Sequence, residues 1–279
     1  MKTTTRNAAW GPRPTRCCGT GSTTPIYRSA TASISIRSTP LKALYSQETK
    51  SRSCAKNTLL VLNEEELVIR AILWDNDGVL VDTEGLYFQA GREVLVTQGV
   101  ELTQEDFVEQ SLQKGQSVFD LLPNQDAELI DRLRLQRNAR YSALLRERVR
   151  VLDGVVETLR TLHGRALMGV VTGSRKDHFD IIHAQTNLLP FFEFVVARED
   201  YKQAKPHPDA YLTAMRLHGL EPETCVVVED SERGCAAAAK AGLRVLVVPN
   251  ELSQHGDFSP AYKVLGSVRE VVDEVDQLR

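Results

Sequence analysis

The apolar run Ile72-Leu73-Trp74 is followed directly by Asp75-Asn76-Asp77-Gly78-Val79-Leu80. An aliphatic run of this kind is typical of a strand buried in a parallel sheet. Such a strand should not end in two carboxylates unless their charge is compensated, because two carboxylates about 4 Å apart repel each other by roughly 4 kcal/mol at an effective dielectric constant of about 20. A divalent cation, or a proton held on one carboxyl group, removes that cost. The stretch therefore predicts a metal site, a proton-transfer site or both.

Apolar runs and helical segments alternate along the chain from Val68 onward. The apolar runs cover residues 68–74, 167–171, 192–197, 225–228 and 245–248. Helical patterns lie between them at residues 155–163, 178–185, 209–217 and 232–241. Strands that alternate with helices pair in parallel through right-handed crossovers. We therefore predict an α/β fold with a Rossmann-like, doubly wound parallel sheet.

Residues 86–149 interrupt this alternation. They contain helical patterns and no convincing strand; Tyr87, Ala90 and Val94, for example, share one helical face. We expect an inserted small α-helical cap domain here, with a core made of residues 68–85 and 150–279. Because the insertion follows the first strand, it should lie over the carboxyl edge of the sheet, where open α/β folds bind ligands.

Residues 1–67 form an N-terminal extension that we expect to be disordered. Residues 1–63 are rich in Ser and Thr and hold ten Lys and Arg against one acid, Glu48. The extension is either an organellar transit peptide, which would place the protein in a mitochondrion or chloroplast, or the product of a start assigned too far upstream, which would leave the protein cytoplasmic.

The remainder of the chain is acidic, which argues against nucleic-acid binding. No uninterrupted apolar run approaches the roughly 20 residues of a membrane span. The cysteines have no zinc-site spacing, so the simplest interpretation is a reducing compartment in which Cys225 and Cys235 are small core residues. All five are Cys17, Cys18, Cys54, Cys225 and Cys235. The sequence makes no prediction of oligomeric state.

Polar residues follow four of the five apolar runs. They are Asp75 and Asp77 after the first run, Thr172-Gly173-Ser174 after the second, Lys205 after the third and Glu229-Asp230 after the fourth. Asp209, a little beyond Lys205, is expected to cap the next helix. Because parallel strands end at one edge of a sheet, these side chains should surround one crevice. Carboxylates suit Mg²⁺, and ammonium, hydroxyl and amide groups suit phosphoryl oxygens.

This ordered set resembles the motifs of the haloacid dehalogenase-like superfamily of phosphatases, and the resemblance covers essentially all of residues 68–279. The stretch 77–84 and the helical insertion resemble the subgroup with a small α-helical cap after the first motif, which includes phosphoglycolate phosphatases and beta-phosphoglucomutases. The resemblance implies a Mg²⁺-dependent hydrolase that acts on a phosphoric monoester of a small metabolite. A sugar phosphate, phosphoglycolate and a nucleoside monophosphate all stay open as substrates.

The resemblance also implies roles for the motif residues. Asp75 would attack phosphorus and form an aspartyl-phosphate, and Asp77 would act as general acid and then as general base. Asp75, the backbone carbonyl of Asp77 and Asp230 would hold Mg²⁺, and Glu229 would support or share the ligation. The phosphoryl oxygens would be bound by Thr172, by the Gly173 amide and by Lys205. For substrate contacts we expect Glu84, near the hinge between cap and core, and the cap residues Lys114 and Gln116.

Two alternatives remain open at this point. A sugar-phosphate mutase of the same subgroup would carry an arginine at the position that here is Val118, and a histidine within the region that here reads Gly85-Leu86-Tyr87-Phe88. A catalytically idle relative that binds a ligand or partner would have lost a motif residue, and none is lost. The expected cap also holds a run of arginines that could draw anionic substrates or form a solvated face. They are Arg132, Arg134, Arg137, Arg140, Arg146, Arg148 and Arg150.

Overall fold

The computed structural model describes residues 68–278. The predictions for residues 1–67, and for Cys17, Cys18 and Cys54 among them, lie outside the described residues, and the compartment stays a prediction. Within residues 68–278 no helix is both long enough and apolar enough to cross a membrane.

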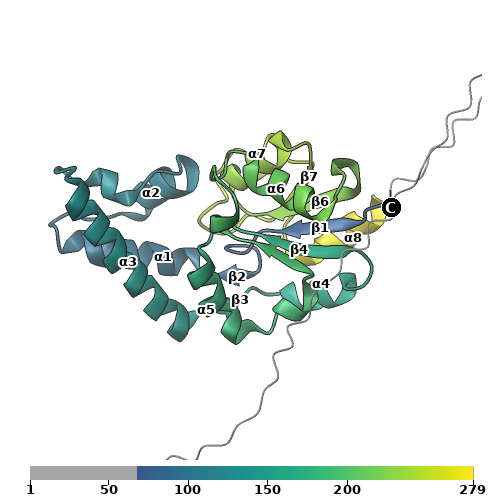
Figure 1. Cartoon of the computed structure of the whole chain (residues 1–279), viewed down its shortest axis with the longest axis horizontal. Helices are drawn as coiled ribbons and strands as arrows, with labels where there is room; N and C mark the ends of the chain where they lie inside the picture. Colours follow the sequence, from purple (N-terminus) through teal and green to yellow (C-terminus); the bar gives the residue numbers. More distant parts are fainter. Residues whose placement is uncertain (1–67, 279) are drawn as a thin grey trace, which may run out of the picture. The chain divides into compact units, whose positions relative to one another are not determined.

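A six-stranded parallel sheet forms the centre of the core, with the strand order β5-β4-β1-β6-β7-β8 (Figure 1). This confirms the predicted α/β class and the doubly wound parallel sheet. The strands are β1 Ala71–Trp74, β4 Leu167–Val171, β5 Phe194–Val196, β6 Cys225–Glu229, β7 Arg244–Val247 and β8 Lys263–Val264.

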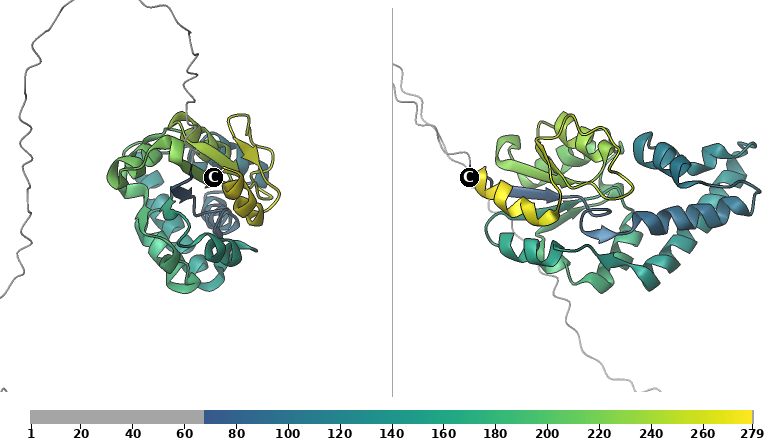
Figure 2. Two further views of the ribbon diagram at one scale, coloured as in Figure 1. Left: turned by 90° about the vertical axis from the view of Figure 1, so that its right-hand side faces the viewer. Right: turned by 180° about the vertical axis from the view of Figure 1, so that it is seen from behind.

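Helices cover both faces of this sheet, as the two opposed views in Figures 1 and 2 show. Successive residues of β1 point to opposite faces, so Ile72 and Trp74 join one hydrophobic cluster while Ala71 and Leu73 join the other. The first cluster includes residues of α4 Val155–Leu162, α5 Lys176–Thr186 and α8 Val271–Gln277, and the second includes residues of α6 Asp209–His218 and α7 Glu232–Lys240. Because both faces are covered, the strands can be apolar throughout.

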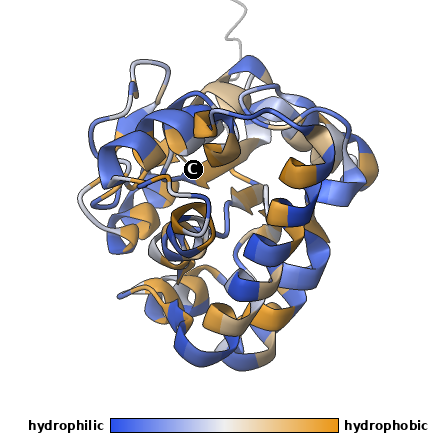
Figure 3. Cartoon of the chain, turned by 90° about the vertical axis from the view of Figure 1, so that its left-hand side faces the viewer, coloured by the Kyte–Doolittle hydropathy of each residue, from blue (hydrophilic) through white to orange (hydrophobic). Residues whose placement is uncertain are grey.

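Residues 84–148 are mainly helical. The elements are α1 Glu84–Val96, α2 Gln104–Phe107, the π-helix η1 Val108–Gln113, the 3₁₀ helix η2 Val118–Leu121 and α3 Ala127–Arg148. They enclose a hydrophobic cluster of their own, which includes Leu95, Phe107, Phe119 and Leu133. In Figure 3 the helices in this region carry both hydrophobic and hydrophilic residues, as expected for helices that are buried on one side only. We call residues 86–149 the cap and the rest of the described chain the core; this division stays a prediction.

Two short strands, β2 Val81–Asp82 and β3 Arg150–Val151, pair antiparallel where the chain enters and leaves the cap. The ion pair between Arg150 and Asp82, at 2.5 Å, crosses the same two strands. Neither of these strands, nor β8, was predicted from the sequence. Each has two residues, which is too short for a hydrophobic period to be recognised.

The remaining elements are short helical turns in the loops of the core. They are η3 Leu189–Phe191, η4 Arg198–Asp200, η5 Pro222–Thr224 and η6 Val268–Glu270. One predicted helix cap is wrong: α6 is preceded by Pro208 as its N-cap, and Asp209 is its first residue. The Asp209 carboxylate instead accepts hydrogen bonds from the backbone amides of Lys202 and Gln203. It therefore ties down the loop that carries Lys205.

Candidate active site

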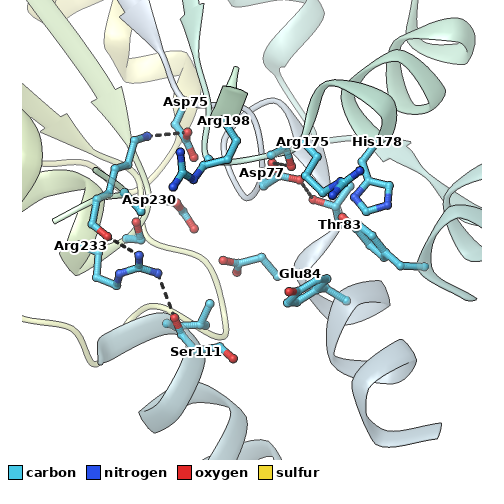
Figure 4. Close-up of a pocket in the computed structure, with 18 of the residues that line it drawn as sticks. Asp75, Asp77, Thr83, Glu84, Ser111, Arg175, His178, Arg198, Asp230 and Arg233 are labelled. Carbon is cyan, nitrogen blue, oxygen red and sulfur yellow. Dashed lines mark hydrogen bonds and ion pairs between the residues drawn. The ribbon is translucent and has the colours of Figure 1, made fainter. Parts of the chain in front are cut away.

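The carboxyl ends of β1 and β6 bring the two acidic motifs side by side. The Asp75 amide donates to the Val228 carbonyl at 2.9 Å, so the pairing of the two strands continues to the first aspartate. Strands β4 and β5 lie on one side of β1. The later strands β6, β7 and β8 lie on its other side. The boundary between β1 and β6 is thus the topological switch point, where open α/β sheets leave a crevice. A cavity of about 350 Å³ lies there, lined by side chains from both core and cap (Figure 4).

Lys205 forms the centre of a buried ionic cluster on the core side of this cavity. Its ammonium group donates to Asp75 Oδ1 at 2.8 Å, to Glu229 Oε1 at 2.6 Å and to the Val171 carbonyl at 3.0 Å. Burial alone would lower the pKa of Lys205, but the charges of Asp75 and Glu229 outweigh it and hold the pKa well above its ordinary value. Lys205 is therefore a fixed positive charge beside Asp75.

Glu229 is committed to this cluster rather than to the open cavity. Its Oε1 accepts from Tyr211 Oη at 2.6 Å as well as from Lys205, and its side chain is fully buried. Gly234, in the first turn of α7, makes the room: a Cβ atom there would lie 2.0 Å from the Glu229 carboxylate. Glu229 thus positions Lys205, and Gly234 is required for that arrangement.

The carboxylates of Asp75, Glu229 and Asp230 could hold a metal ion. Each offers an oxygen, and these atoms lie within 4.8 Å of one another. Burial, followed by the charge of Glu229, raises the pKa of Asp75 to about 8. Burial also raises the pKa of Asp230 well above its ordinary value, with a further contribution from Glu84. Lys205 pairs with two of these three carboxylates, Asp75 and Glu229, and a buried group of carboxylate oxygens fits a hard divalent cation.

Asp230 is held in place by two features of its surroundings. The Asn250 amide donates to Asp230 Oδ2 at 2.7 Å and to Glu84 Oε2 at 3.0 Å. Gly78 has a φ of +79°, which a side chain rarely adopts, and a Cβ atom there would lie 2.2 Å from Asp230 Oδ2. The glycine after the two aspartates therefore serves both the turn of the backbone and the close approach of Asp230.

Asp77 points away from the metal-binding group and toward hydroxyl groups. Thr83 Oγ1 donates to Asp77 Oδ1 at 2.5 Å, and Ser174 Oγ donates to Asp77 Oδ2 at 2.6 Å. Its side chain lines the cavity but is not among the carboxylates that could hold a cation. The two aspartates of the first motif therefore have different surroundings, one beside an ammonium group and the other among neutral donors.

Thr172 and Gly173 follow β4 and differ in what they present to the cavity. Gly173 lines the cavity. The Thr172 side chain is fully buried, and its hydroxyl oxygen accepts from the Ser174 amide at 2.9 Å and donates to Asp77 Oδ2 at 3.3 Å. Of the two hydroxyl residues in this motif, Ser174 is the one that lines the cavity. The predicted contact of Thr172 with a phosphoryl oxygen stays a prediction.

Glu84 lies at the cavity wall, as its predicted substrate contact requires. Burial raises the pKa of Glu84 to about 7, while the hydrogen bond from Asn250 opposes that shift. Lys114 and Gln116 do not line the cavity. Lys114 pairs instead with Glu109 at 2.5 Å, and both side chains are about half exposed. The structure therefore gives no support to a substrate contact by Lys114 or Gln116.

Other cap residues line the cavity in their place. They are Phe107, Ser111 and Leu112 from α2 and η1, and Arg137, Asn138 and Tyr141 from α3, with Tyr87 from α1. Arg137 is the member of the predicted arginine run that reaches the cavity. Its guanidinium group lies 4.6 Å from the centre of the Tyr87 ring and donates to the neutral amide of Asn138. A cation with these partners keeps its charge available for an anionic ligand.

Most of the other arginines of that run have partners on the surface of the cap or beside it. Arg134 pairs with Asp131, Arg140 with Glu93 and Arg150 with Asp82. As a group, these arginines therefore form mainly a solvated helix face on which charged side chains are paired.

Arg233, in the first turn of α7, connects core and cap. One of its terminal nitrogens donates to the Ser111 carbonyl at 3.1 Å, and the other donates to the Lys205 carbonyl (Figure 4). Gly115 lies against the same guanidinium group, because a Cβ atom there would be 2.7 Å from it. Arg233 therefore links the cap segment that follows α2 to the loop that carries the buried lysine.

Sequence reasoning missed several of these residues. Asn250 follows the fifth apolar run, so the rule applied to the other four runs, that residues after a strand reach the site, would have found it. Ser174 lies in a quoted motif but was given no role. Thr83, Tyr211 and Arg233 carry no comparable signal, because each is identified only by a partner distant in the sequence or on another element.

The chain is similar to several known proteins. A family model described as haloacid dehalogenase-like hydrolase matches residues 72–248. The protein CbbY of Rhodobacter capsulatus is 31% identical over 208 residues, which cover 69% of this chain and 91% of that protein. Fructose-1-phosphate phosphatase YqaB of Escherichia coli (strain K12) is 30% identical over 176 residues, 62% of this chain and 92% of that protein. The crystal structure of CbbY from Rhodobacter sphaeroides in complex with phosphate aligns with a TM-score of 0.67 at 25% identity, over 75% of this chain and 100% of that one.

Proposed function

This chain belongs to the haloacid dehalogenase-like hydrolase family, and we propose that it hydrolyses the phosphate monoester of a small metabolite through an aspartyl-phosphate on Asp75. Family membership confirms the resemblance that the motifs indicated. The observation that carries the proposal is that Asp75, Asp77, Lys205 and Asp230 all line one cavity at the switch point of the sheet. Nucleophile, proton donor, cation and metal ligand are what phosphoryl transfer through a carboxylate requires.

In the first half of the proposed reaction, a carboxylate oxygen of Asp75 forms a bond to phosphorus. The bond from phosphorus to the ester oxygen breaks, its electron pair stays on that oxygen, and Asp77 donates the proton that makes it an alcohol. Lys205 offsets negative charge on the phosphoryl group and, through its 2.8 Å ion pair, restricts the Asp75 carboxylate to one orientation. Restricting the nucleophile in this way lowers the entropy cost of attack.

In the second half, Asp77 is a carboxylate and accepts a proton from the water that attacks phosphorus. The bond between phosphorus and Asp75 then breaks, which releases inorganic phosphate and restores both aspartates. The hydroxyls of Thr83 and Ser174 support this role, because they can stabilise the ionised form of Asp77 by hydrogen bonds of 2.5 and 2.6 Å.

We assign Mg²⁺ to the carboxylate cluster, because its donors are all oxygens. Asp75, Asp230 and the backbone carbonyl of Asp77 would hold it, and when bound it would neutralise charge on the phosphoryl oxygens. Glu229 is better suited to support than to ligate, since Lys205 and Tyr211 both donate to its Oε1 at 2.6 Å.

The size and charge of the cavity fit a small anionic substrate. Its volume of about 350 Å³ lies at the lower end of ordinary ligand pockets. Lys205 and four arginines line it, so a dianionic phosphate would find compensating charge there. These arginines are Arg137, Arg175, Arg198 and Arg233. The relatives support a sugar phosphate first, because one of them is named as a phosphatase of fructose 1-phosphate; phosphoglycolate and a nucleoside monophosphate stay open.

The mutase alternative finds no support at the position that would carry its arginine. Val118 is 2% exposed and belongs to the hydrophobic cluster of the cap, so the side chain at this position packs into the cap rather than facing a ligand. A hydrolase is therefore preferred over a mutase.

The test is phosphate release by the full chain from a panel of phosphorylated sugars, phosphoglycolate and nucleoside monophosphates, with Mg²⁺ and with EDTA. We expect turnover that requires Mg²⁺ and that is absent in Asp75→Asn. Release that continues in Asp75→Asn would overturn the assigned nucleophile. A folded wild type that releases no phosphate from any ester would overturn the proposed function in favour of a mutase or an idle relative.

A further inference from the structure

Asn76 stands between the two catalytic aspartates and has a fully buried side chain. Its Oδ1 lies 2.9 Å from Nε2 of His183, which belongs to α5 and is 5% exposed. Its Nδ2 donates to Asp77 Oδ2 at 3.3 Å. On the far side of the imidazole, His183 Nδ1 lies 2.8 Å from Thr186 Oγ1. Thr186, His183 and Asn76 thus form a continuous hydrogen-bonded chain that ends on Asp77, and we call these three residues the Asn76 relay.

The chemistry of the groups determines the direction of every bond in the Asn76 relay. The Asp77 carboxylate only accepts, so the amide nitrogen of Asn76 must face it and the amide oxygen must face His183. An oxygen needs a donor, so His183 carries its proton on Nε2. Its Nδ1 is then an acceptor and takes the hydroxyl proton of Thr186. Burial lowers the pKa of His183 to about 4, so the imidazole is neutral near pH 7 and this single tautomer is available.

The Asn76 relay has a consequence for the two oxygens of Asp77. Oδ2 accepts from Ser174 at 2.6 Å, from Thr172 at 3.3 Å and from Asn76 at 3.3 Å. The Asn76 amide nitrogen can only donate, so it favours an unprotonated Oδ2, whereas the Thr83 hydroxyl beside Oδ1 can accept as well as donate. Oδ1 is therefore the oxygen that can carry a transferable proton. In the acid step the O–H bond at Oδ1 breaks, its proton moves to the ester oxygen, and the electron pair stays on Asp77.

We propose that His183 is a positioning residue that, through Asn76, holds Asp77 in the orientation that delivers its proton to the leaving group. The inference rests on the proposed function, since it assigns a task within that reaction. Burying an amide and an imidazole costs free energy unless both are hydrogen-bonded, and the site could have been filled by apolar residues. The imidazole also packs against the ring of Phe179, whose centre lies 4.2 Å from that of His183. A polar pair placed there and aimed at Asp77 indicates a requirement of the site rather than of the core.

The first test compares two classes of ester in His183→Leu. A p-nitrophenyl phosphate releases its leaving group without a proton, whereas an alkyl phosphate needs one. We expect kcat/KM, which reports transfer to Asp75, to fall at least tenfold more for the alkyl ester than for the aryl ester. His183→Gln should restore part of the difference, because its amide N–H can donate to Asn76. Equal losses for both esters would overturn the proposal and reduce His183 to a packing role.

Two further variants separate the Asn76 relay from a general loss of stability. Asn76→Leu should change the ratio of the two esters as His183→Leu does, and the double variant should lose no more than either single one, because residues acting as one unit are not additive. Thr158→Val is the matched control: Thr158 is a buried polar residue of α4 outside the cavity. It should leave the ratio of the two esters unchanged. A double variant in which the losses multiply would overturn the relay.

The second test does not depend on activity. Imidazole ¹⁵N NMR of the full chain distinguishes Nε2–H from Nδ1–H tautomers, and His183→Gln identifies the His183 signals among those of the six histidines. We expect the pure Nε2–H tautomer in the wild type and a mixture in Asn76→Leu. An Nδ1–H tautomer in the wild type would overturn the Asn76 relay even if the enzyme is active. A wild type with the Nε2–H tautomer that cleaves neither ester would overturn the proposed function and, with it, the catalytic task of His183.

Discussion

The two walls of the cavity are built differently. On the core wall, Lys205 and Asp75 are buried and joined by a hydrogen bond of 2.8 Å, and Glu229 accepts from Lys205 at 2.6 Å behind that wall. On the cap wall, Arg137 bonds to the neighbouring Asn138 and lies against an aromatic ring, so its charge has no carboxylate partner among the described residues. The core wall is therefore preorganised for one chemistry, whereas the cap wall keeps polar groups that a substrate can engage. Perturbing the core wall should abolish reaction, and perturbing the cap wall should change selectivity.

The largest effect is expected from the nucleophile. Asp75→Asn removes the attacking carboxylate while keeping the shape of the side chain, and we expect kcat to fall by roughly 10⁴-fold or more. Single-turnover assays with a ³²P-labelled ester should find no phosphoryl-enzyme in this variant. If Asp75→Asn still formed the labelled intermediate, Asp75 would not be the nucleophile, and the contrast between the two walls would be lost.

The buried lysine should give the next largest effect, and it should appear in stability as well as in rate. Lys205→Met leaves Asp75 and Glu229 buried without their cation, and breaking a buried ion pair from one side costs about 3–5 kcal/mol. Urea denaturation measures that loss. Lys202→Met, three residues earlier and exposed, is the control and should change the free energy of unfolding by less than about 0.5 kcal/mol. If the two variants had similar free energies of unfolding, the buried carboxylates of Asp75 and Glu229 would not depend on Lys205.

A pH dependence of stability is expected from His183, behind the core wall. Burial lowers its pKa in the folded state to about 4, whereas the unfolded chain titrates near the ordinary value of 6.5. Between these values the unfolded state binds more protons, so the free energy of unfolding should fall as the pH drops from 6.5 to 4, by an amount on the order of 3 kcal/mol.

Denaturation at pH 7, 6, 5 and 4 measures this slope in the wild type and in His183→Gln. The variant should lose part of the slope, and what remains belongs to other groups. An identical slope in both proteins would contradict a neutral buried His183.

The smallest effect is expected on the cap wall. Arg137→Ala should raise KM for a phosphorylated sugar by roughly 10-fold, the worth of one hydrogen bond to a charged group, with a change in kcat of less than about threefold. Lys114→Ala is the matched control, because Lys114 lies outside the cavity and pairs with Glu109 on an exposed face. It should leave both constants unchanged. A larger effect of Lys114→Ala than of Arg137→Ala would support the substrate contact that the sequence predicted for Lys114.

The outcome for single residues follows how each prediction was made. Predictions that used only the end of a strand placed Asp75, Asp77, Lys205 and Asp230 at the cavity wall. The rule failed for Asn250 only because it was not applied to the fifth run. Predictions for the cap had no such rule, and Lys114 and Gln116 do not line the cavity. In α3 the apolar residues Ile130, Leu133 and Tyr141 share the buried side of the helix, but their spacing does not indicate that Arg137 reaches the cavity.

The alternation of apolar runs and helical patterns was enough to predict the parallel, doubly wound core and the acidic residues at one edge of its sheet. The physical reason is that alternating strands and helices must pair in parallel, and parallel strands end at one edge. The cap residues that reach the cavity and the hydrogen bonds that hold the aspartates depend instead on how the helices pack in three dimensions. Asn76 and His183 are 107 positions apart, and Arg233 and Ser111 are 122 apart. Contacts over such separations depend on how packed helices are rotated and spaced, and no local pattern in the chain encodes that.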